Sequence, residues 1–275
     1  MTTSGPAAVD VVIVAHNAGA FLAEAVASSA EQAGAGCVWV VDAASEDASV
    51  AAATRRWPGS HIIDAPNDGF AAGNNRGLAA TDAPFVLLLN PDALLLPGAL
   101  DRLVIAARAR PRAAIVAPLV LDLDGGVQAG SFGRFPTLAH VVAQRLRGVA
   151  DRARHRRVRA PRAPAGLSPV DWVTGAAMLV RREAIVDAGP MDDGFFLYYE
   201  DVEWCHRLRS RGWEVLVEPA AQVAHHRGAA AVSSSLIEDA YRASFYRYCD
   251  LQRLWGLKAL SRTLLPLRRL AGGRA

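Results

Sequence analysis

Residues Phe85–Asp92 read FVLLLNPD, an apolar run of strand length that ends in a polar tripeptide. Because the run is short and Pro91 interrupts it, it predicts a buried β-strand rather than a helix. Residues two apart on an extended chain project to the same side, so Asn90 and Asp92 are expected to point together off the carboxyl end of this strand. Open α/β sheets bind ligands at that edge. A carboxylate beside an amide suits a divalent cation that also binds a diphosphate, although Asn-Pro-Asp is ordinary turn chemistry as well.

The sequence on either side of this stretch alternates between strand-like and helix-like segments. Such alternation predicts an α/β fold with a mostly parallel central sheet flanked by helices. Strands are expected at 9–15, 37–41, 61–63, 85–89, 115–120, 172–180 and 214–217, and helices at 21–32, from 45 onward, after 67–77, at 100–109, at 198–210 and from 236 onward. Residues 122–169 are Gly-rich, then Arg-rich, then Pro-rich, and are interpreted as a flexible basic insertion with one short helix at 138–146.

Composition limits the class of protein. Hydrophobic residues make up 52% of the 275, which excludes a disordered chain. The three cysteines give neither a disulfide framework nor zinc spacing, which favours a reducing compartment. No signal peptide and no apolar stretch of the ~18–20 residues that span a bilayer is visible, so a cytoplasmic location is expected. The arginine cluster at 145–162 lacks interleaved aromatic residues, so nucleic acid is not an expected partner.

Two further segments carry chemistry near expected strand ends. Asp42 follows an apolar strand and either accepts hydrogen bonds from a base or sugar or caps the next helix. The Gly- and Asn-rich segment 67–77 offers close backbone approach and N–H groups for a phosphate, yet it matches neither the dinucleotide fingerprint nor a Walker A loop.

The segment 195–203 reads FFLYYEDVE and places two adjacent acids after an aromatic cluster. Desolvation by such a cluster would raise the pKa of a carboxyl group toward the range that is useful for a general base. The same acids also suit the first turn of a helix, where the helix dipole favours negative charge. Both interpretations hold together.

Taken in order, these motifs resemble the family 2 glycosyltransferases of GT-A fold, especially the bacterial rhamnosyltransferase-like branch. The resemblance runs from Val9 to about Ser235, and each motif is weak singly while the order is specific. The motifs are VVIVAHN at 11–17, VVDAASED at 40–47, the segment 67–77, LLNPDA at 88–93, TGAAM at 174–178, YED at 199–201 and AHHRG at 224–228.

The resemblance implies roles for individual residues. Asp201 would be the general base, with Glu200 beside it as the alternative, and Asp92 would bind a metal ion together with His225, which is preferred over His226. The metal would be Mg²⁺ or Mn²⁺, since oxygen ligands suit both and a histidine ligand favours Mn²⁺. The nucleotide-sugar donor would be bound by Ala15, Asn17, Asp42, Asn67, Gly69, Gly73, Asn75, Arg76, Asn90 and Asp92. The acceptor would be bound by Trp172, Gly175 and Ala176.

The implied activity is inverting transfer of a sugar from a nucleotide-diphosphate donor to an acceptor hydroxyl in cell-envelope or polysaccharide synthesis. The implied donor is dTDP-rhamnose, with a UDP-hexose as the alternative, and the acceptor is a glycan or a polyprenyl-diphosphate-linked sugar. A sugar-nucleotide pyrophosphorylase would need an N-terminal Gly-rich loop with a basic residue, which 16–20 lacks. A non-catalytic scaffold or sugar-nucleotide-binding protein would be expected to lack Asp92 or Asp201, and both are present.

The predicted organisation is one GT-A domain over 1–235 and a basic amphipathic helical extension over 236–275. Within the domain, 9–120 would bind the nucleotide, 122–169 is the insertion, and 170–235 would bind the acceptor and carry catalysis. Residues 251–275 contain six basic side chains and no acid. Their leucines at 257, 260, 264 and 267 lie on one side of a helix, which predicts peripheral binding to an anionic membrane on its cytoplasmic face. The alternative is that these leucines pack on the domain.

Overall fold

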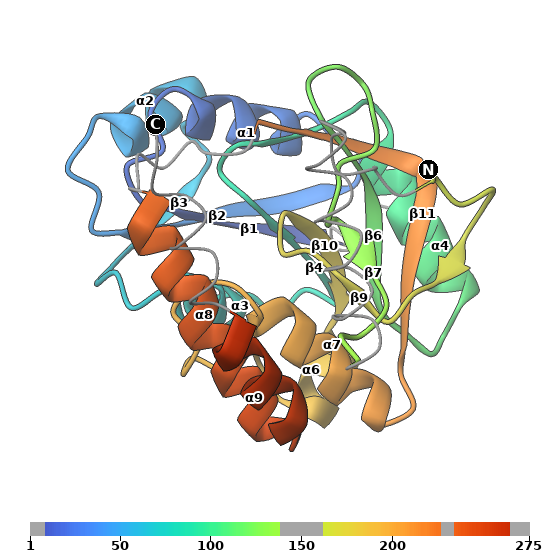
Figure 1. Ribbon diagram of the computed structural model, residues 1–275. Helices are drawn as coiled ribbons and strands as arrows, with labels where there is room; N and C mark the ends of the chain where they lie inside the picture. The colour runs from blue at the N-terminus through green and yellow to red at the C-terminus, as the bar shows by residue number, and fades with distance from the viewer. Residues whose placement is uncertain (1–8, 138–161, 227–233, 265–275) are drawn as a thin grey trace.

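The computed structural model describes residues 9–137, 162–226 and 234–264 as a central β-sheet between two layers of helices (Figure 1). The strand order is β3-β2-β1-β4-β10-β6-β11-β5, with β8 beside β11, and β7 and β9 form a separate small sheet. The strands are β1 Val9–Ala15, β2 Ala35–Ala43, β3 His61–Ala65, β4 Phe85–Leu89, β5 Ala93–Leu95, β6 Ala113–Leu121, β7 Phe132–Gly133, β8 Ser168–Pro169, β9 Trp172–Val173, β10 Ala177–Arg181 and β11 Glu214–His225. The helices are α1 Phe21–Ala30, α2 Ser49–Arg56, α3 Phe70–Ala79, α4 Ala99–Ala109, α6 Arg182–Ala188, α7 Glu200–Ser210, α8 Ser234–Leu251 and α9 Trp255–Leu264.

Six of the nine strands of the large sheet, namely β1, β2, β3, β4, β6 and β11, point in the same direction, as expected for a mostly parallel sheet. Strands β3, β2, β1 and β4 pair in parallel, and so do β6 and β11. Strand β10 is antiparallel to both of its neighbours, β4 and β6, and β5 is antiparallel to β11. The fold is therefore α/β with a mixed, mostly parallel sheet.

The two faces of the sheet bury two separate hydrophobic layers. Ile13 and Leu87 pack on one face against residues of α1 and α4, whereas Val12 and Leu88 pack on the other face with Leu78 of α3 and residues of α7. All five residues of β4 are buried because helices cover both sides of this central strand. A strand covered on both faces has no polar alternation, which explains the continuous apolar run at 85–89.

Four expected boundaries were wrong. Helix α2 begins at Ser49 rather than at residue 45, because the side chains of Asp42, Asn17 and Asp47 accept hydrogen bonds from the backbone N–H groups of residues 45, 46 and 49. The expected strand 172–180 is two strands, β9 and β10, and the helix expected from 198 begins at Glu200. Strand β11 continues to His225 through an irregularity between 218 and 222, which accommodates a proline at 219. The helix expected at 138–146 lies outside the described residues.

Helices α8 and α9 pack beside the lower helical layer (Figure 1). Arg247 of α8 forms two hydrogen bonds to the Asp192 carboxylate, at 2.8 and 2.9 Å, and its guanidinium lies over the ring of Phe195. In α9, Leu257 is buried with Phe245 in the packed interior. This leucine therefore packs on the rest of the protein, which was the alternative to membrane binding. None of the helices in the described ranges is both long and apolar enough to cross a bilayer.

Candidate active site

The polar tripeptide after β4 faces the end of β11 at the carboxyl edge of the sheet. The Nε2 atom of His225 lies 3.1 Å from Oδ1 of Asp92 and 3.4 Å from Nδ2 of Asn90. Asn90 and Asp92 therefore both lie beside His225. The backbone there is not extended, as the spacing argument assumed, but forms a turn in which the N–H of Ala93 donates to the carbonyl of Asn90 at 3.1 Å. Strand β11 brings the histidine there because its last residues pair with β5, His225 opposite Ala93.

The structure distinguishes the two adjacent histidines. His225 faces Asp92, whereas the ring of His226 packs against Phe21 with ring centroids 4.8 Å apart. The side chain of Asp92 is only 8% exposed and that of His225 12%. A buried carboxylate beside a buried imidazole makes a compact pair of ligand atoms that is partly shielded from water.

The chemistry of these side chains fits a divalent cation. A carboxylate oxygen and an imidazole nitrogen are ligands that Mn²⁺ and Mg²⁺ accept to different degrees, and a nucleotide diphosphate would supply further oxygens. In this arrangement Asn90 turns its amide nitrogen toward His225, and a half-turn of the amide presents the oxygen instead. Across the described ranges, no group of three or more His, Cys, Asp or Glu side chains forms a complete site. Within the described residues Asp92 and His225 are the pair whose chemistry fits the cation, and a diphosphate would have to supply the other ligands.

The two adjacent acids begin α7, and both are desolvated. Asp201 is half-buried and accepts hydrogen bonds from the N–H of Gly175 at 2.9 Å and of Val202 at 2.7 Å. Burial raises the pKa of Asp201 above its ordinary value, although these two hydrogen bonds act in the opposite direction. Burial and the nearby Asp201 charge raise the pKa of Glu200 further, and its Oε2 atom has no hydrogen-bond partner in the described structure. Both pKa values thus move in the direction that the sequence predicts, and burial is the main cause.

A continuous set of backbone contacts joins the two carboxylate centres. The N–H of Gly175 donates to Asp201, and the carbonyl oxygen of Ala176, the next residue, accepts the N–H of Asn90 at 2.9 Å. The side chain of Ala176 is buried, so the 174–176 segment presents backbone rather than side chains at this place. The turn between β9 and β10 therefore fixes the Asp201 carboxylate relative to the end of β4.

The loops after β1 and β2 form the adjoining part of the edge. Asn17, with a positive φ of 50°, accepts the N–H of Glu46 at 2.8 Å, and its own N–H donates to Ser45 at 3.1 Å. Asp42 accepts the N–H of Ser45 at 2.9 Å, and Ala15 is the buried partner of Asp42 in the β1–β2 pairing. Asp42 therefore fixes the turn at Ser45 and does not cap α2, which begins at Ser49 with Ala48 as its N-cap residue. Its predicted contact with a base or sugar stays a prediction.

Ala44 lies between these residues with a φ of 55°, in the left-handed region that costs an L-residue about 1–2 kcal/mol. We expect Ala44→Gly to stabilise the protein, because relief of this strain exceeds the added entropy of the unfolded glycine, about 0.5–1 kcal/mol. Thermal unfolding should show a rise in Tm of about 2 °C. The matched control is Ala43→Gly, a buried residue in β2, which should lower Tm. A fall in Tm for Ala44→Gly would contradict the strain argument.

Helix α3 contains most of the Gly- and Asn-rich segment and contacts the residues that precede Asp201. Gly69, with a φ of 102°, begins the helix, and the N–H of Phe70 donates to the carbonyl of Phe196 at 2.8 Å. The Asn75 side chain exchanges two hydrogen bonds with the backbone of Met191, at 2.9 and 3.0 Å. These contacts place residues 191–196 on the start and middle of α3.

The remaining residues of this segment have varied surroundings. Gly73 packs so closely on β1 that an added Cβ would lie 2.6 Å from the Val14 side chain. Arg76 forms an ion pair with Asp68 at 2.5 Å, and its Nη1 atom is buried without a hydrogen-bond partner in the described structure. Asn67 is exposed in the loop before α3. Contacts to the rest of the fold thus explain Gly73 and Asn75, and the Arg76 guanidinium is engaged by Asp68, while Asn67 is exposed at the surface.

Gly69→Ala is expected to lower both stability and turnover. A Cβ at Gly69 would lie 2.3 Å from the carbonyl oxygen of Phe196, so the backbone that leads to Asp201 must move. A shift of about 1 Å near a catalytic group reduces kcat by roughly 10²-fold. The control is Gly34→Ala, which has a similar positive φ of 77° but whose nearest neighbour would be 3.7 Å away. Equal kcat in the two variants would show that the Phe196 contact does not position the base.

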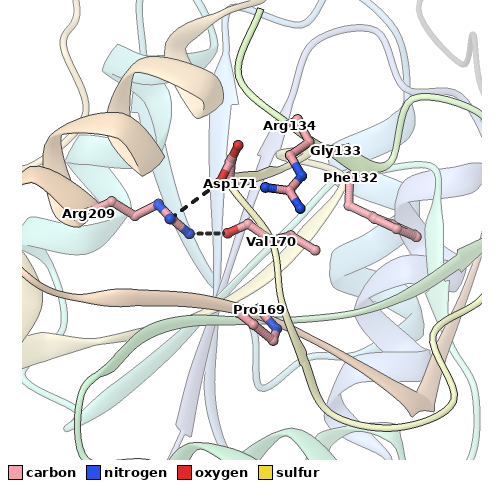
Figure 2. A pocket seen from close by; sticks show the side chains of 7 residues that line it. All are labelled: Phe132, Gly133, Arg134, Pro169, Val170, Asp171 and Arg209. Atoms are coloured by element: carbon pink, nitrogen blue, oxygen red, sulfur yellow. Dashed lines mark hydrogen bonds and ion pairs between the residues drawn. The ribbon is translucent and has the colours of Figure 1, made fainter.

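Trp172, the third residue expected to bind the acceptor, lies in β9 and donates from its indole nitrogen to the carbonyl of Arg134 at 3.0 Å. Beside it, a cavity of about 330 Å³ is lined by Phe132, Gly133, Arg134, Pro169, Val170, Asp171 and Arg209 (Figure 2). Arg209 is held there by the carbonyl of Val170 and the carboxylate of Asp171. This cavity contains none of the predicted site residues.

Gln128 is a contact residue of the site that the sequence did not indicate. Its Oε1 atom lies 2.8 Å from Nδ1 of His225. The residue lies in the Gly-rich part of 122–169, which lacks periodicity and was interpreted as an insertion. Only the approach of β11 to β6 reveals this partner.

A mostly parallel sheet with acids and a histidine at its carboxyl edge is the arrangement of a GT-A fold. Solved structures with this fold are similar to this chain over most of its length. GalNAc-T7 with UDP, GalNAc and Mn²⁺ matches with a TM-score of 0.64 at 15% identity, over 90% of this chain and 48% of that one. The mannosyltransferase PcManGT from Pyrobaculum calidifontis, in complex with GDP-Man and Mn²⁺, matches with a TM-score of 0.56 at 17% identity, over 82% of this chain and 58% of that one.

The model of the family described as glycosyl transferase family 2 matches residues 10–183, and the chain belongs to this family. An N-acetylglucosaminyl-diphospho-decaprenol L-rhamnosyltransferase of Mycobacterium tuberculosis is 32% identical over 204 residues, 69% of this chain and 66% of that protein. The rhamnosyltransferase WbbL of Escherichia coli is 26% identical over 68% of this chain and 72% of that protein. The chain spans just under two thirds of the length of the mycobacterial relative.

Proposed function

We propose that this protein is an inverting glycosyltransferase that moves a sugar from a nucleotide-diphosphate donor to an acceptor hydroxyl. The observation that carries the proposal is the contact sequence Asp201–Gly175–Ala176–Asn90, which places a desolvated carboxylate beside a second centre made of Asp92 and His225. One centre suits proton removal and the other suits a diphosphate with its cation.

In the proposed reaction, Asp201 accepts the proton of the acceptor hydroxyl while the hydroxyl oxygen bonds to the anomeric carbon. The bond from that carbon to the diphosphate oxygen breaks in the same step, so the configuration inverts and no enzyme nucleophile is needed. The raised pKa of Asp201 makes it a stronger base than an exposed aspartate. The N–H groups of Gly175 and Val202 orient its carboxylate.

Asp92 and His225 are the proposed protein ligands of Mg²⁺ or Mn²⁺, which would neutralise charge that grows on the leaving diphosphate. The proposed nucleotide contacts are the loops after β1 and β2, with Asn17 and Asp42, together with Asn67 and Arg76 before and on α3. The backbone of 174–176 and Trp172 lie on the side from which the acceptor would enter.

The names of the relatives suggest the substrates. L-Rhamnose, carried by dTDP, is the proposed donor sugar, and a sugar on a polyprenyl diphosphate is the proposed acceptor, because the mycobacterial relative is named for both rhamnose and a diphospho-decaprenol carrier. Such an acceptor would place the protein at the cytoplasmic face of a membrane. The alternative donor is a UDP-hexose, since the related hexosyltransferase Agl10 of Haloferax volcanii is 26% identical over 54% of this chain.

The test is a panel of nucleotide sugars incubated with purified protein, Mn²⁺ and a synthetic N-acetylglucosaminyl-diphospho-polyprenol. Mass spectrometry of the released nucleotide and of the lipid product identifies the donor and the transferred sugar. Release of dTDP with a matching increase in product mass supports rhamnose. Absence of product from every donor, with donor binding retained, would contradict the proposed acceptor.

A further inference from the structure

Gln128 is held in a fixed place beside the candidate active site. It is only 3% exposed and follows a hairpin that begins at the end of β6. Its N–H donates to the carbonyl of Val120 at 2.8 Å, and its carbonyl accepts the Ser131 hydroxyl at 2.8 Å. Both bonds fix the backbone, so the side-chain amide has a defined direction.

The surroundings of the Gln128 amide determine which of its atoms faces which neighbour. Its Nε2 lies 2.8 Å from a carboxylate oxygen of Asp122 and 3.3 Å from the carbonyl oxygen of His225. Both neighbours only accept hydrogen bonds, so the NH₂ group must face them. The amide oxygen is thereby directed to Nδ1 of the His225 ring, at 2.8 Å.

This direction sets the position of the proton on His225. An amide oxygen only accepts, so the Nδ1 atom must carry the hydrogen that it donates to Gln128. In a neutral ring the lone pair is then on Nε2, which faces the Oδ1 atom of Asp92 at 3.1 Å and the Asn90 amide at 3.4 Å. The lone pairs of Nε2 and of the Asp92 oxygen repel each other at this distance, and either a cation or a second proton between them removes the repulsion. The hydrogen on Nδ1 is present with the cation and with the second proton alike.

We infer that Gln128 is a positioning residue, which holds His225 in the Nδ1–H tautomer and keeps Nε2 directed at the cation site beside Asp92. Asp122 completes the arrangement because its carboxylate prevents the amide from turning over. For the cation, this inference rests on the proposed function, whereas the tautomer follows from the contacts alone. Partners of metal-binding histidines act in this way through the nitrogen that does not bind the metal.

The test uses full-length protein with ¹⁵N-labelled histidine and four variants, of which three alter the surroundings of His225 and one assigns its signal. Gln128→Met removes both halves of the amide at nearly equal volume. Ser131→Ala is the matched control, because it removes a buried hydrogen bond to the same residue without changing the amide. Asp122→Asn combined with Gln128→Glu exchanges the two side-chain types and keeps an acceptor for Nδ1. His225→Asn assigns the signal by removing it.

Two quantities are measured. Long-range ¹H–¹⁵N spectra of the metal-free protein at about pH 9, well above the ordinary imidazole pKa, report the tautomer of His225. The electron paramagnetic resonance signal of free Mn²⁺, titrated in the presence of dTDP, reports the Mn²⁺ affinity. We expect Gln128→Met to lose the Nδ1–H tautomer and to weaken Mn²⁺ binding roughly 10- to 100-fold. Ser131→Ala and the double variant should retain the tautomer and most of the affinity.

The outcomes separate this inference from the proposed function. An unchanged His225 tautomer in Gln128→Met overturns the role of Gln128, whatever the Mn²⁺ affinity. Loss of the tautomer in Ser131→Ala as well also overturns it, since general disruption would then be the cause. A changed tautomer with unchanged Mn²⁺ affinity confirms the Gln128 contact and rejects His225 as a metal ligand. If Gln128→Met does not fold, loss of the tautomer in the double variant contradicts the inference.

Discussion

Asp201→Asn should lower kcat by roughly 10²-fold or more, the usual scale for the loss of a general base, while the affinity for the donor nucleotide stays nearly unchanged. An asparagine retains the shape and can still accept one of the two N–H bonds from Gly175 and Val202, but it cannot accept the proton of the acceptor hydroxyl. The measurements are kcat from nucleotide release under saturating substrates and Kd for the donor nucleotide by calorimetry.

Asp193→Asn is the matched control, because it changes an exposed aspartate in the same segment and should leave kcat unchanged. The pH dependence gives a second check. A base acts when deprotonated, and burial raises the pKa of Asp201, so the acidic fall in kcat should occur at a higher pH than for an ordinary aspartate. Nearly full kcat in Asp201→Asn would assign the base elsewhere, and Glu200→Gln would be the next variant to measure.

Asp92→Ala should abolish the enhancement of nucleotide binding by a divalent cation. The carboxylate is the charged protein ligand at the end of β4, and His225 alone offers one neutral nitrogen. Calorimetric titration with dTDP, with and without Mg²⁺ or Mn²⁺, measures the effect. Binding without the cation should change little, because the loops after β1 and β2 are untouched.

The control for this variant is Asp64→Ala, which removes an exposed carboxylate from β3 beside Asp42. It should keep the full cation effect, since Asp64 contacts neither Asp92 nor His225 in the described structure. The same cation enhancement in Asp92→Ala and in the parent protein would remove Asp92 from the metal site. A cation effect reduced equally by both substitutions would point to net charge rather than to ligation.

The parts of the fold that the sequence predicted correctly are those with strong local signals. The apolar run at 85–89 indicated a buried strand, and the Asn-Pro-Asp sequence after it indicated the turn that is found there. The start of α2 was not predictable locally, because Asn17 takes up the N–H of Glu46 from 29 residues away. Gln128 was not predictable either, because its contact with His225 spans 97 residues and depends on the pairing of β6 with β11.

Among the residues of the candidate site, those with local motifs were likewise predictable, and those that depend on long-range contacts were not. Asp92, His225 and Asp201 were found through short motifs, and the choice of His225 over His226 follows from the side of β11 on which each side chain lies. Asn75 stood in a motif but is engaged with Met191, a segment that the sequence had not placed near it. Close backbone contacts between segments far apart in the chain leave no local sequence pattern. The sequence therefore predicted only ligand binding for Gly69, whereas the structure also packs it against the backbone of Phe196.

The position of β10 between β4 and β6 has a consequence for synthesis of the chain. Both of those strands leave the ribosome before Ala177. Strand β4 can already pair with β1 along one edge, but its other edge and both edges of β6 have no partner until β10 arrives, because β4 and β6 do not pair with each other. In the interval, two almost wholly apolar strands have unpaired edges, which are the features that promote association between nascent chains. The amino-terminal half therefore cannot form its complete sheet alone, because the strand that joins β4 to β6 comes from residues 177–181.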